Sequence, residues 1–514
     1  MEKRADLKLS WLFLFIVCGA FLLRIWQLDI KPVHFDEGIN GHFVASIWRN
    51  GFYRYDPTNF HGPLYFYLLQ LSEMVFGWGI FGFRLTTILI QIATLILIGK
   101  HRRFVGKAAT AAALILAVSP AFVFYGRYAI HESLFIFGQV AFSYGYFLYR
   151  YDRSVKSIWW LGLALVVLIT TKETFFIFLG TWAIAIGVVN LIDRFVPKFG
   201  SNEIKVKLQP VPLSEWSSVA MVSVLMILAL FTGFFMFPQG AADMFTALQV
   251  WTKTGTAKTG HEKVFLYWFD LFRRYEWPIL VSLVISPLVF FTVNRSLRIL
   301  ILTGFGTWLA YSLIPYKTPW LVLNLIWPLA FCGGAVLGRV IPSVPKLPGL
   351  RTALSLGVLI CVGVSFAKMW KLNFHDFAAR GEPYVYVQST IDFKKVVDTL
   401  YRQAAKHPES RTMKIAATNR DTWPLPYLLI PFTNVSWGRP EVEMLNAASV
   451  VLSDSEDRAV IESRLVGKFF VLPFQIRDSY QDVQAYLEFS RFRDVVPAST
   501  PTFEGKLAVE GKAL

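Results

Sequence analysis

The sequence has little of what a chain of soluble domains contains. Only 17% of its 514 residues are charged, against about a quarter in average globular proteins. The three cysteines, Cys18, Cys332 and Cys361, all lie inside apolar runs, so no disulfide framework is available. The eight histidines show no HxxxH or HxH spacing, and no repeat of the solenoid kind occurs. These absences exclude a disulfide-stapled domain, a histidine metal motif and a repeat array.

Long apolar runs fill the chain up to about residue 369. A helix needs about 20 apolar residues to cross a bilayer. Eleven runs meet this need, the shortest being the fifth: 9–28, 84–100, 106–125, 132–149, 157–171, 173–192, 217–237, 277–294, 297–314, 319–338 and 351–369. The sequence therefore predicts a polytopic α-helical membrane domain of about 11 transmembrane helices over residues 1–369.

The remainder, residues 370–514, has the composition of a soluble domain. Met413–Thr418, Ala448–Ser453 and Lys468–Pro473 are β-rich runs. Ile391–His407 and Glu456–Leu465 carry apolar residues at helical spacing. We expect a C-terminal α/β domain without a Gly-rich phosphate loop.

The net charge of +16, from 51 basic and 35 acidic residues, is unevenly distributed. Nineteen basic residues and six acidic ones fall in six short segments: 1–8, 100–107, 150–156, 193–216, 294–298 and 339–351. The positive-inside rule assigns these segments to the cytoplasm. We therefore expect a protein of the inner (cytoplasmic) membrane with a cytoplasmic N-terminus and a periplasmic C-terminal domain. The excess of basic residues therefore reflects membrane topology and does not indicate that the protein binds nucleic acid.

The first outer loop, residues 29–83, carries adjacent carboxylates at Asp36 and Glu37, preceded by His34. Ionisable groups beside a membrane span are candidates for function. Successive helical residues point about 100° apart, so one acid faces a given substrate. One base suffices for a transferase whose leaving group is a phosphate, whereas a glycosidase needs two carboxylates. The alternative is that Asp36 only caps a helix over Gly38–Arg49.

Two further outer segments carry polar residues. His61 precedes a Pro63 helix that we expect to lie at the membrane interface, and His61 could be only an interfacial residue. Arg127 presents a fork suited to phosphate, next to His131 and Glu132. Glu132 stands at a predicted helix start, where a carboxylate could serve merely as a cap.

Lysines on the outer face are unusual by the positive-inside rule, and two of them stand in short turns between apolar runs. Lys172 precedes Glu173. Glu173 could neutralise Lys172 locally, or Lys172 could bind an anionic ligand. Tyr316 and Lys317 lie in a turn bracketed by prolines. With Arg127, these lysines would form a cationic pocket for a lipid-linked phosphate.

No metal or other cofactor is assigned from these residues. Asp36, Glu37 and Glu132 could hold a hard divalent cation together with waters.

The motifs together resemble a known group. They are Asp36-Glu37, Pro63-Leu64-Tyr65, Phe83-Arg84-Leu85, Arg127 to Glu132, Thr171-Lys172-Glu173, Pro315 to Trp320, Pro383 to Val387, and Asp421 to Pro426. The pattern is similar to the GT-C, or C-type, membrane glycosyltransferases of the protein mannosyltransferase and aminoarabinose transferase kind, and to the flippase-activity-associated family within that group. The resemblance implies a catalytic acid in the first outer loop, matched here by Asp36, and a polyprenyl-phosphate sugar donor. The second outer-loop acid of the group is usually an aspartate, whereas Glu132 stands here.

We therefore expect an inverting glycosyltransferase that moves a sugar from a polyprenyl-phosphate donor to an extracytoplasmic lipid, glycan or protein. Its catalytic set would be Asp36, Glu37 and Glu132. Substrate would be bound by His34, His61, Arg127, His131, Lys172, Glu173, Tyr316 and Lys317. The alternatives are a non-catalytic membrane protein that binds or helps translocate lipid-linked glycans, for which paired broken helices are expected, and a scaffold organised by the tail.

Overall fold

The computed structural model describes residues 10–59, 61–196, 209–256, 260–340, 349–477 and 482–506. The basic segment 1–8 and parts of two others, 197–208 and 341–348, lie outside the described residues. The chain divides into two compact units. The first comprises residues 1–28 and 46–377, and the second comprises 29–45 and 378–514. The start of the first outer loop, predicted as part of the membrane domain, thus groups with the C-terminal residues, because its contacts are with them.

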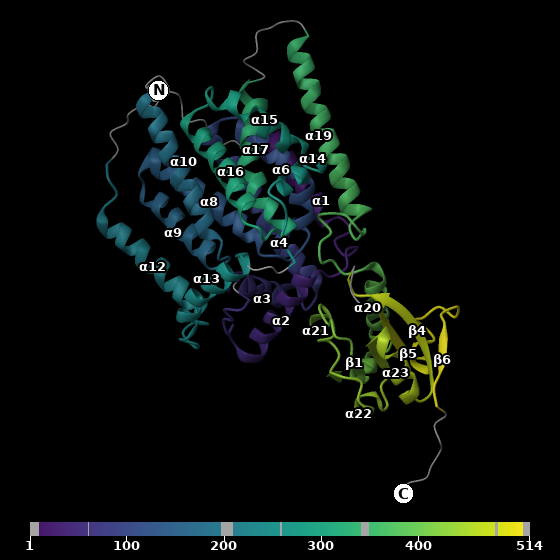
Figure 1. Ribbon diagram of the computed structural model, residues 1–514. Helices are drawn as coiled ribbons and strands as arrows, with labels where there is room; N and C mark the ends of the chain where they lie inside the picture. Colours follow the sequence, from purple (N-terminus) through teal and green to yellow (C-terminus); the bar gives the residue numbers. More distant parts are fainter. Residues whose placement is uncertain are drawn as a thin grey trace. The chain divides into compact units, whose positions relative to one another are not determined.

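The first unit is helical, with its longer helices running alongside one another (Figure 1). In chain order its described elements are α1 (Trp11–Ile25), α3 (Leu64–Phe76), α4 (Ile80–Lys100), α5 (Arg102–Val105), α6 (Ala108–Ala117), α7 (Pro120–Gly126), α8 (Glu132–Asp152), α9 (Val155–Ile169), α10 (Phe175–Phe195), α12 (Leu213–Phe231), α13 (Gly240–Thr256), α14 (Tyr267–Arg274), α15 (Trp277–Phe290), α16 (Arg295–Leu313), η1 (Pro319–Val322), α17 (Leu323–Ala335), η2 (Val336–Val340) and α19 (Leu350–Phe374). Helix α2 (Phe35–Asn50) contains the boundary between the units.

The chain is a multi-pass membrane protein. Within the described ranges, six helices are long and apolar enough to cross a bilayer: Ile80–Val105, Phe175–Phe195, Leu213–Phe231, Arg295–Leu313, Pro319–Gly338 and Thr352–Phe374. Helices α6 and α7, bent by 64° at their junction, make at most a seventh crossing. The eleven predicted spans exceed this number because α1, α9 and α15 are shorter than 18 residues, and because α8, although 21 residues long, is not apolar enough. At 1.5 Å per residue α1 is about 22 Å long, against about 30 Å of hydrocarbon.

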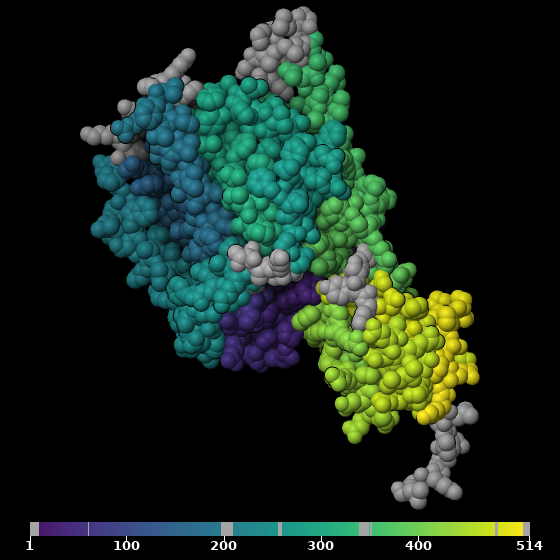
Figure 2. All heavy atoms as spheres, viewed as in Figure 1, coloured from purple at the N-terminus to yellow at the C-terminus, as the bar shows by residue number. Residues whose placement is uncertain are grey.

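The outer helices of this unit expose apolar side chains. In α12 and α19 only 11% of the spanning window is buried, and Val224 and Leu359 are more than half exposed. Figure 2 shows the green α19 along the margin of the first unit. Apolar surface of this extent is unfavourable in water and is solvated by lipid tails.

Small residues allow the inner helices to approach closely. All of α17 is buried, and it packs against α6. A Cβ atom added at Gly334 would lie well inside van der Waals contact with the carbonyl oxygen of Ala108. Such small-residue contacts replace hydrophobic burial as the source of helix packing within a membrane.

We expect Gly334→Ala to destabilise the protein by roughly 1–3 kcal/mol, because the added methyl group overpacks this contact. The matched control is Gly187→Ala in α10, where a Cβ atom would meet nothing within 4 Å. Alanine forms helix better than glycine by about 1 kcal/mol, so the control should be neutral or stabilising. Thermal unfolding in detergent measures both, and equal melting temperatures would contradict the packing argument.

The bend between α6 and α7 is held by a buried acid from the start of α15. The Ser119 hydroxyl caps α7 by accepting from the backbone N–H of Phe122 at 3.1 Å. The carboxylate of Glu276 accepts from the N–H of Ala121 at 2.8 Å and is 1% exposed. Burial raises the pKa of Glu276 to about 7, although the hydrogen bonds from Ala121 and Ser119 and the charge of Lys368 oppose the shift.

This shift predicts how stability depends on pH. Between pH 4.5, the ordinary pKa of the side chain, and pH about 7, the folded state binds more protons than the unfolded state. Stability should therefore fall as pH rises through this window and level off above it. The shift corresponds to at most about 3 kcal/mol. Glu276→Gln keeps an acceptor for Ala121 and should flatten the melting temperature between pH 5 and 8. Glu443→Gln, at an exposed site, serves as the control, and an unchanged slope in Glu276→Gln would contradict the assignment.

The second unit contains a mixed six-stranded sheet with strand order β2-β1-β3-β5-β4-β6. Its elements after residue 377 are α20 (Ile391–Lys406), η3 (Pro408–Thr412), β1 (Ile415–Ala417), α21 (Leu425–Leu428), β2 (Val435–Trp437), α22 (Val442–Leu445), β3 (Val450–Asp454), η4 (Ser455–Asp457), α23 (Arg458–Arg464), β4 (Lys468–Gln475), β5 (Asp482–Glu488), α24 (Phe489–Phe492) and β6 (Thr502–Glu504). Strand β1 pairs in parallel with β2 and β3, and the other pairings are antiparallel.

Helices cover both faces of this sheet. Phe393 of α20 packs on Phe474 with ring centres 6.0 Å apart. Ile461 of α23 belongs to a core cluster with Phe469, which faces the other way because neighbouring strand residues alternate. Strands β1, β3 and β4 fall on the three predicted β-rich runs. Strands β2, β5 and β6 lie outside the predicted runs.

Candidate functional site

The adjacent carboxylates of the first outer loop stand at the start of α2, with His34 before the first helical residue. Glu37 reaches back and accepts from the backbone N–H of His34 at 2.9 Å. His34 in turn accepts, at Nδ1, from the N–H of Asp36 at 3.1 Å. This is the reciprocal arrangement of a capping box, in which the third helical residue satisfies the cap residue. The alternative that Asp36 caps the helix is wrong, because α2 begins one residue before it.

Asp36 and Glu37 consequently differ in what they can do. Glu37 is fully buried, and its carboxylate is used by the helix start. Asp36 is half-buried, and its carboxylate has no hydrogen-bond or ion-pair partner among the residues that the structure describes. An unpaired carboxylate with access to solvent is available to accept a proton, whereas a buried capping carboxylate is not.

His34 ties this helix start to a second motif. Because Nδ1 accepts, the ring proton of neutral His34 is on Nε2, which donates to the carbonyl of Tyr386 at 2.9 Å. His34 also forms a β-bridge with Gln388, whose side-chain amide donates to the carbonyl of Pro32 at 2.9 Å. The segment around residues 383–388 therefore holds the loop in place.

Two glycines bring a third motif against the same helix. A Cβ atom at Gly38 would collide with Pro424, and one at Gly41 would collide with the ring of Tyr427. The motif Asp421 to Pro426 therefore packs directly on α2. Three motifs that are widely separated in the sequence meet around Asp36 within the second unit.

In the first unit, Lys172 and Glu132 form a buried ion pair. Lys172 is 4% exposed and Glu132 is 3% exposed. Burial alone would lower the pKa of Lys172, but the attraction of Glu132 and Glu173 outweighs it and raises the pKa above its usual value. Lys172 is therefore a permanently charged group, and removing its partner would leave that charge buried.

Histidines extend this pair into a cluster. Nδ1 of His61 lies 3.3 Å from Oε2 of Glu173, and the rings of His61 and His131 are 4.7 Å apart. Burial, followed by the charges of His61 and Lys172, lowers the pKa of His131 well below its usual value. Its Nε2 atom is buried without a hydrogen-bond partner in the described part of the chain. His131 is therefore neutral at physiological pH.

Backbone pairing explains the glycine after His61. The N–H of Gly62 donates to the carbonyl of Thr171 at 3.1 Å, and that of Leu64 donates to Thr170 at 3.0 Å. A Cβ atom at Gly62 would overlap the carbonyl group of Thr170. Only glycine allows this approach, which brings the two loops of the cluster together.

Arg127 is completely buried and donates to the carbonyls of Leu23 and Gln27 at 3.2 and 2.7 Å. Two more fully buried arginines were not among the predicted site residues, although Arg84 stands in one of the motifs. Arg84 donates to the carbonyl of Leu28 at 2.8 Å, and Arg24 lies within electrostatic range of Arg127. The sequence contains a signal for both, because each arginine lies within or at the end of an apolar run, where a charge is costly.

Tyr316 and Lys317 pair with the loop at 261–263. The ring of Tyr316 packs on His261 at 5.1 Å. The ammonium group of Lys317 donates to the carbonyls of Lys263 and Ile314 at 3.1 and 2.6 Å. Burial lowers the pKa of Lys317. These carbonyls satisfy the hydrogen bonds of the lysine without neutralising its charge.

The predicted site residues therefore form separate groups. One, which we call the histidine–carboxylate cluster, consists of His61, His131, Glu132, Lys172 and Glu173. His34, Asp36 and Glu37 lie together at the start of α2. Arg127 and the Tyr316–Lys317 turn each make their own contacts, and the cationic pocket that would join Arg127, Lys172 and Lys317 stays a prediction.

The divalent cation that Asp36, Glu37 and Glu132 could hold stays a prediction, and two of these carboxylates already have other partners. Glu37 is occupied by a backbone N–H and Glu132 by Lys172. No group of three or more His, Cys, Asp or Glu side chains within the described ranges is arranged as a metal site.

Comparisons with known proteins give two kinds of match. The profile of the family described as dolichyl-phosphate-mannose-protein mannosyltransferase matches residues 60–196, which include the histidine–carboxylate cluster. Crystal structures of ArnT from Cupriavidus metallidurans, bound to undecaprenyl phosphate and in the apo state, are 15% identical. They have TM-scores of 0.62 and 0.61 and cover 93% and 92% of this chain and 98% and 97% of theirs. The archaeal oligosaccharyltransferase AglB from Archaeoglobus fulgidus matches 91% of this chain and 74% of its own, at 11% identity and a TM-score of 0.49. No curated protein matches the sequence.

The buried pair gives a stability prediction. Lys172→Met leaves Glu132 buried and uncompensated, so we expect a loss of roughly 3–5 kcal/mol. The double variant Lys172→Met/Glu132→Gln removes both charges and should recover most of this loss. Lys395→Met, which breaks an exposed pair with Asp392, should cost less than about 1 kcal/mol. Thermal unfolding in detergent ranks the variants, and a single variant no less stable than Lys395→Met would contradict the role of the pair.

Proposed function

We propose, from the premise that this chain has the GT-C membrane fold, that it is a glycosyltransferase using a polyprenyl-phosphate sugar donor. The fold match with ArnT, whose crystal structure holds undecaprenyl phosphate, supports this donor class. The match of residues 60–196 to a family described by a dolichyl-phosphate sugar supports it independently. The acceptor is an extracytoplasmic lipid, glycan or protein.

The observation that carries the chemistry is the unpaired carboxylate of Asp36 beside the engaged carboxylate of Glu37. In the proposed reaction Asp36 accepts the proton of an acceptor hydroxyl as its oxygen attacks the anomeric carbon. The bond from that carbon to the lipid phosphate breaks on the opposite side, so the configuration inverts. Phosphate is already a good leaving group, so no second carboxylate is required as an acid.

The leaving phosphate needs positive charge, which we assign to Arg127, Lys172 and Lys317. At Lys172 a phosphate would compete with Glu132 for the ammonium group. At Lys317 it would compete with the neutral carbonyls of Lys263 and Ile314, which do not compensate the positive charge of the side chain. We therefore rank Lys317 above Lys172 for this role. Glu132 and His131 position the sugar or the acceptor.

The orientation follows from the distribution of charge in the sequence. The basic segments put the N-terminus in the cytoplasm and the C-terminal residues outside the inner membrane. Transfer would then take place at the periplasmic face, where a lipid-linked donor is held by its own membrane anchor.

Sugar transfer by purified, reconstituted protein tests this proposal. Radiolabelled polyprenyl-phosphate sugars would be supplied with a crude envelope acceptor. We expect Asp36→Asn to reduce transfer by about 10²-fold or more while donor binding is retained. The matched control, Glu37→Gln, should lower the melting temperature through the helix start and keep transfer per folded molecule. Parallel reactions with EDTA and with added Mg²⁺ test the divalent cation.

Full transfer by Asp36→Asn would show that another group is the base. Donor binding by both proteins, with transfer by neither across a panel of donors and acceptors, would favour the alternative of a non-catalytic protein that binds or moves lipid-linked glycans.

A further inference from the structure

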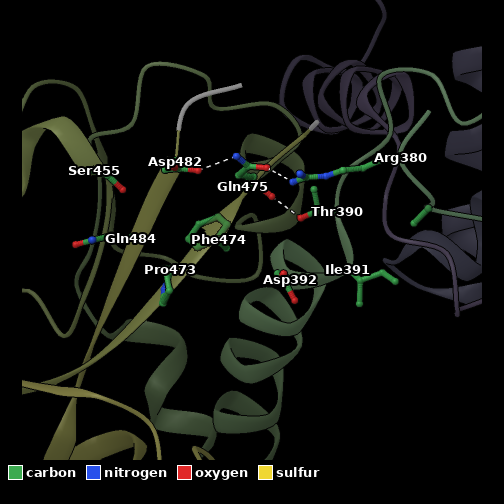
Figure 3. A pocket seen from close by; sticks show the side chains of 11 residues that line it. Arg380, Thr390, Ile391, Asp392, Ser455, Pro473, Phe474, Gln475, Asp482 and Gln484 are labelled. Atoms are coloured by element: carbon green, nitrogen blue, oxygen red, sulfur yellow. Dashed lines mark hydrogen bonds between the residues drawn. The ribbon is translucent and has the colours of Figure 1, made fainter. Parts of the chain in front are cut away.

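A cavity of about 620 Å³ opens in the second unit, between the segment that leads into α20 and the hairpin of β4 and β5 (Figure 3). None of the site residues predicted from the sequence lines it. Its volume falls within the range of about 300–1,000 Å³ that small-molecule sites occupy. The side chains around it are mostly polar and include Arg380, Gln475, Asp482 and Gln484.

Strand register explains why these polar residues gather. In the antiparallel β4–β5 pair, Gln475 lies opposite Asp482 and Pro473 lies opposite Gln484. Residues two apart in a strand point to the same face. The hairpin therefore places one carboxylate and two amides on a single wall.

Internal hydrogen bonds orient this wall. Arg380 donates to the side-chain oxygen of Gln475, and the Gln475 amide donates to Asp482 at 2.7 Å. The hydroxyl of Thr390 donates to the backbone carbonyl of Gln475. Figure 3 shows this chain running across the top of the cavity. Gln475 is thus held at both ends of its amide, so the Asp482 carboxylate next to it is preorganised.

Unused hydrogen-bonding capacity remains beside this chain. Gln484 accepts from the hydroxyl of Tyr486 at 2.7 Å through its side-chain oxygen, which leaves both N–H groups of its amide. The second oxygen of Asp482 and the hydroxyl of Ser455 have no partner within the described residues. The wall therefore offers acceptors and donors close together, as hydroxyl groups require.

The charges on the wall argue against an anionic ligand. Arg380 supplies the one guanidinium of the lining, which also contains the carboxylates of Asp482 and Asp392. Asp392 is paired with the exposed Lys395 at 2.8 Å. A phosphate needs an excess of positive charge, which this cavity lacks. A neutral polyhydroxylated ring can donate to the carboxylate of Asp482 and accept from the amide of Gln484.

Apolar groups complete the match to such a ring. Ile391, which is 45% exposed, lines the cavity together with Pro473 and Phe474. Sugars present apolar C–H faces between their hydroxyl groups, and these faces pack on apolar side chains.

We propose that this cavity binds a neutral saccharide, namely the glycan part of the acceptor. The proposal rests on the proposed transferase function, and it selects a glycan from the possible acceptors. The carboxylate of Asp482 and the amide of Gln484 recognise hydroxyl groups, and Arg380 and Gln475 position them.

Saturation-transfer NMR on the full-length protein in nanodiscs tests the site directly. The probes are mannose, glucose, galactose, N-acetylglucosamine and their β- and α-linked disaccharides, with inorganic phosphate as the charged control. We expect at least one neutral saccharide to bind and phosphate not to compete. Asp482→Ala should weaken binding by about tenfold, the effect of losing one hydrogen bond to a charged group.

Gln484→Ala is the second variant, and Asp494→Ala, at an exposed position outside the cavity, is the matched control. Melting temperatures establish that each variant is folded. Saturation transfer that is equal in the wild type and in both cavity variants would overturn the proposal, as would the absence of binding by every neutral probe.

A separate readout distinguishes failure of this site from failure of the proposed function. Release of polyprenyl phosphate by hydrolysis of the donor needs no acceptor. It should be unchanged in the control Asp494→Ala and lost in Asp36→Asn. Donor hydrolysis by a protein that binds no saccharide would refute the cavity and leave the transferase standing.

Discussion

The ion pair between Lys172 and Glu132 is the interaction on which the loops of the first unit depend. Both side chains are almost completely buried. The cost of burying either charge is therefore offset only when the opposite charge is present. The pair joins the turn before α10 to the start of α8. The backbone N–H of Gly62 donates to the carbonyl of Thr171, beside Lys172. This hydrogen bond places His61 next to Glu173. Loops that are separated by up to 112 residues in the chain thus share one electrostatic centre.

The adjacent acids of the first outer loop, Asp36 and Glu37, differ in whether the carboxylate already accepts a hydrogen bond. A helix start leaves backbone N–H groups without partners. Here one of them is met by Glu37 and another by the imidazole of His34. With that demand satisfied, Asp36 has no structural task that the described contacts reveal. Availability of this kind is what a general base requires, because a carboxylate already accepting buried hydrogen bonds would lose them on taking a proton.

The two units offer different chemistry to a ligand. The first unit contains buried arginines and lysines, and the ammonium group of Lys317 donates to neutral carbonyls, which do not compensate its charge. That environment suits an anionic group. The cavity of the second unit has balanced charge, amides and apolar contacts, which suit a neutral sugar. A transferase that takes a sugar from a lipid phosphate and adds it to a glycan has need of both kinds of site.

The sequence by itself determined the membrane character, the GT-C resemblance and the segments in which polar residues matter. Composition, hydropathy and helical spacing are properties of neighbouring residues, so they can be read along the chain. The sequence also indicated most strands of the second unit that are long enough to show a pattern. It missed β5, although its alternating residues form the wall of the cavity.

Only the tertiary structure decided which of two adjacent acids is available, which carboxylate meets Lys172, and that residues 29–45 group with the C-terminal unit. It alone brought Gln475 and Asp482 together across a hairpin. The physical reason is that hydrogen bonds and ion pairs form between atoms that meet in space. Asp36 and Glu37 have nearly the same local pattern, and their difference arises from geometry at a helix start rather than from composition.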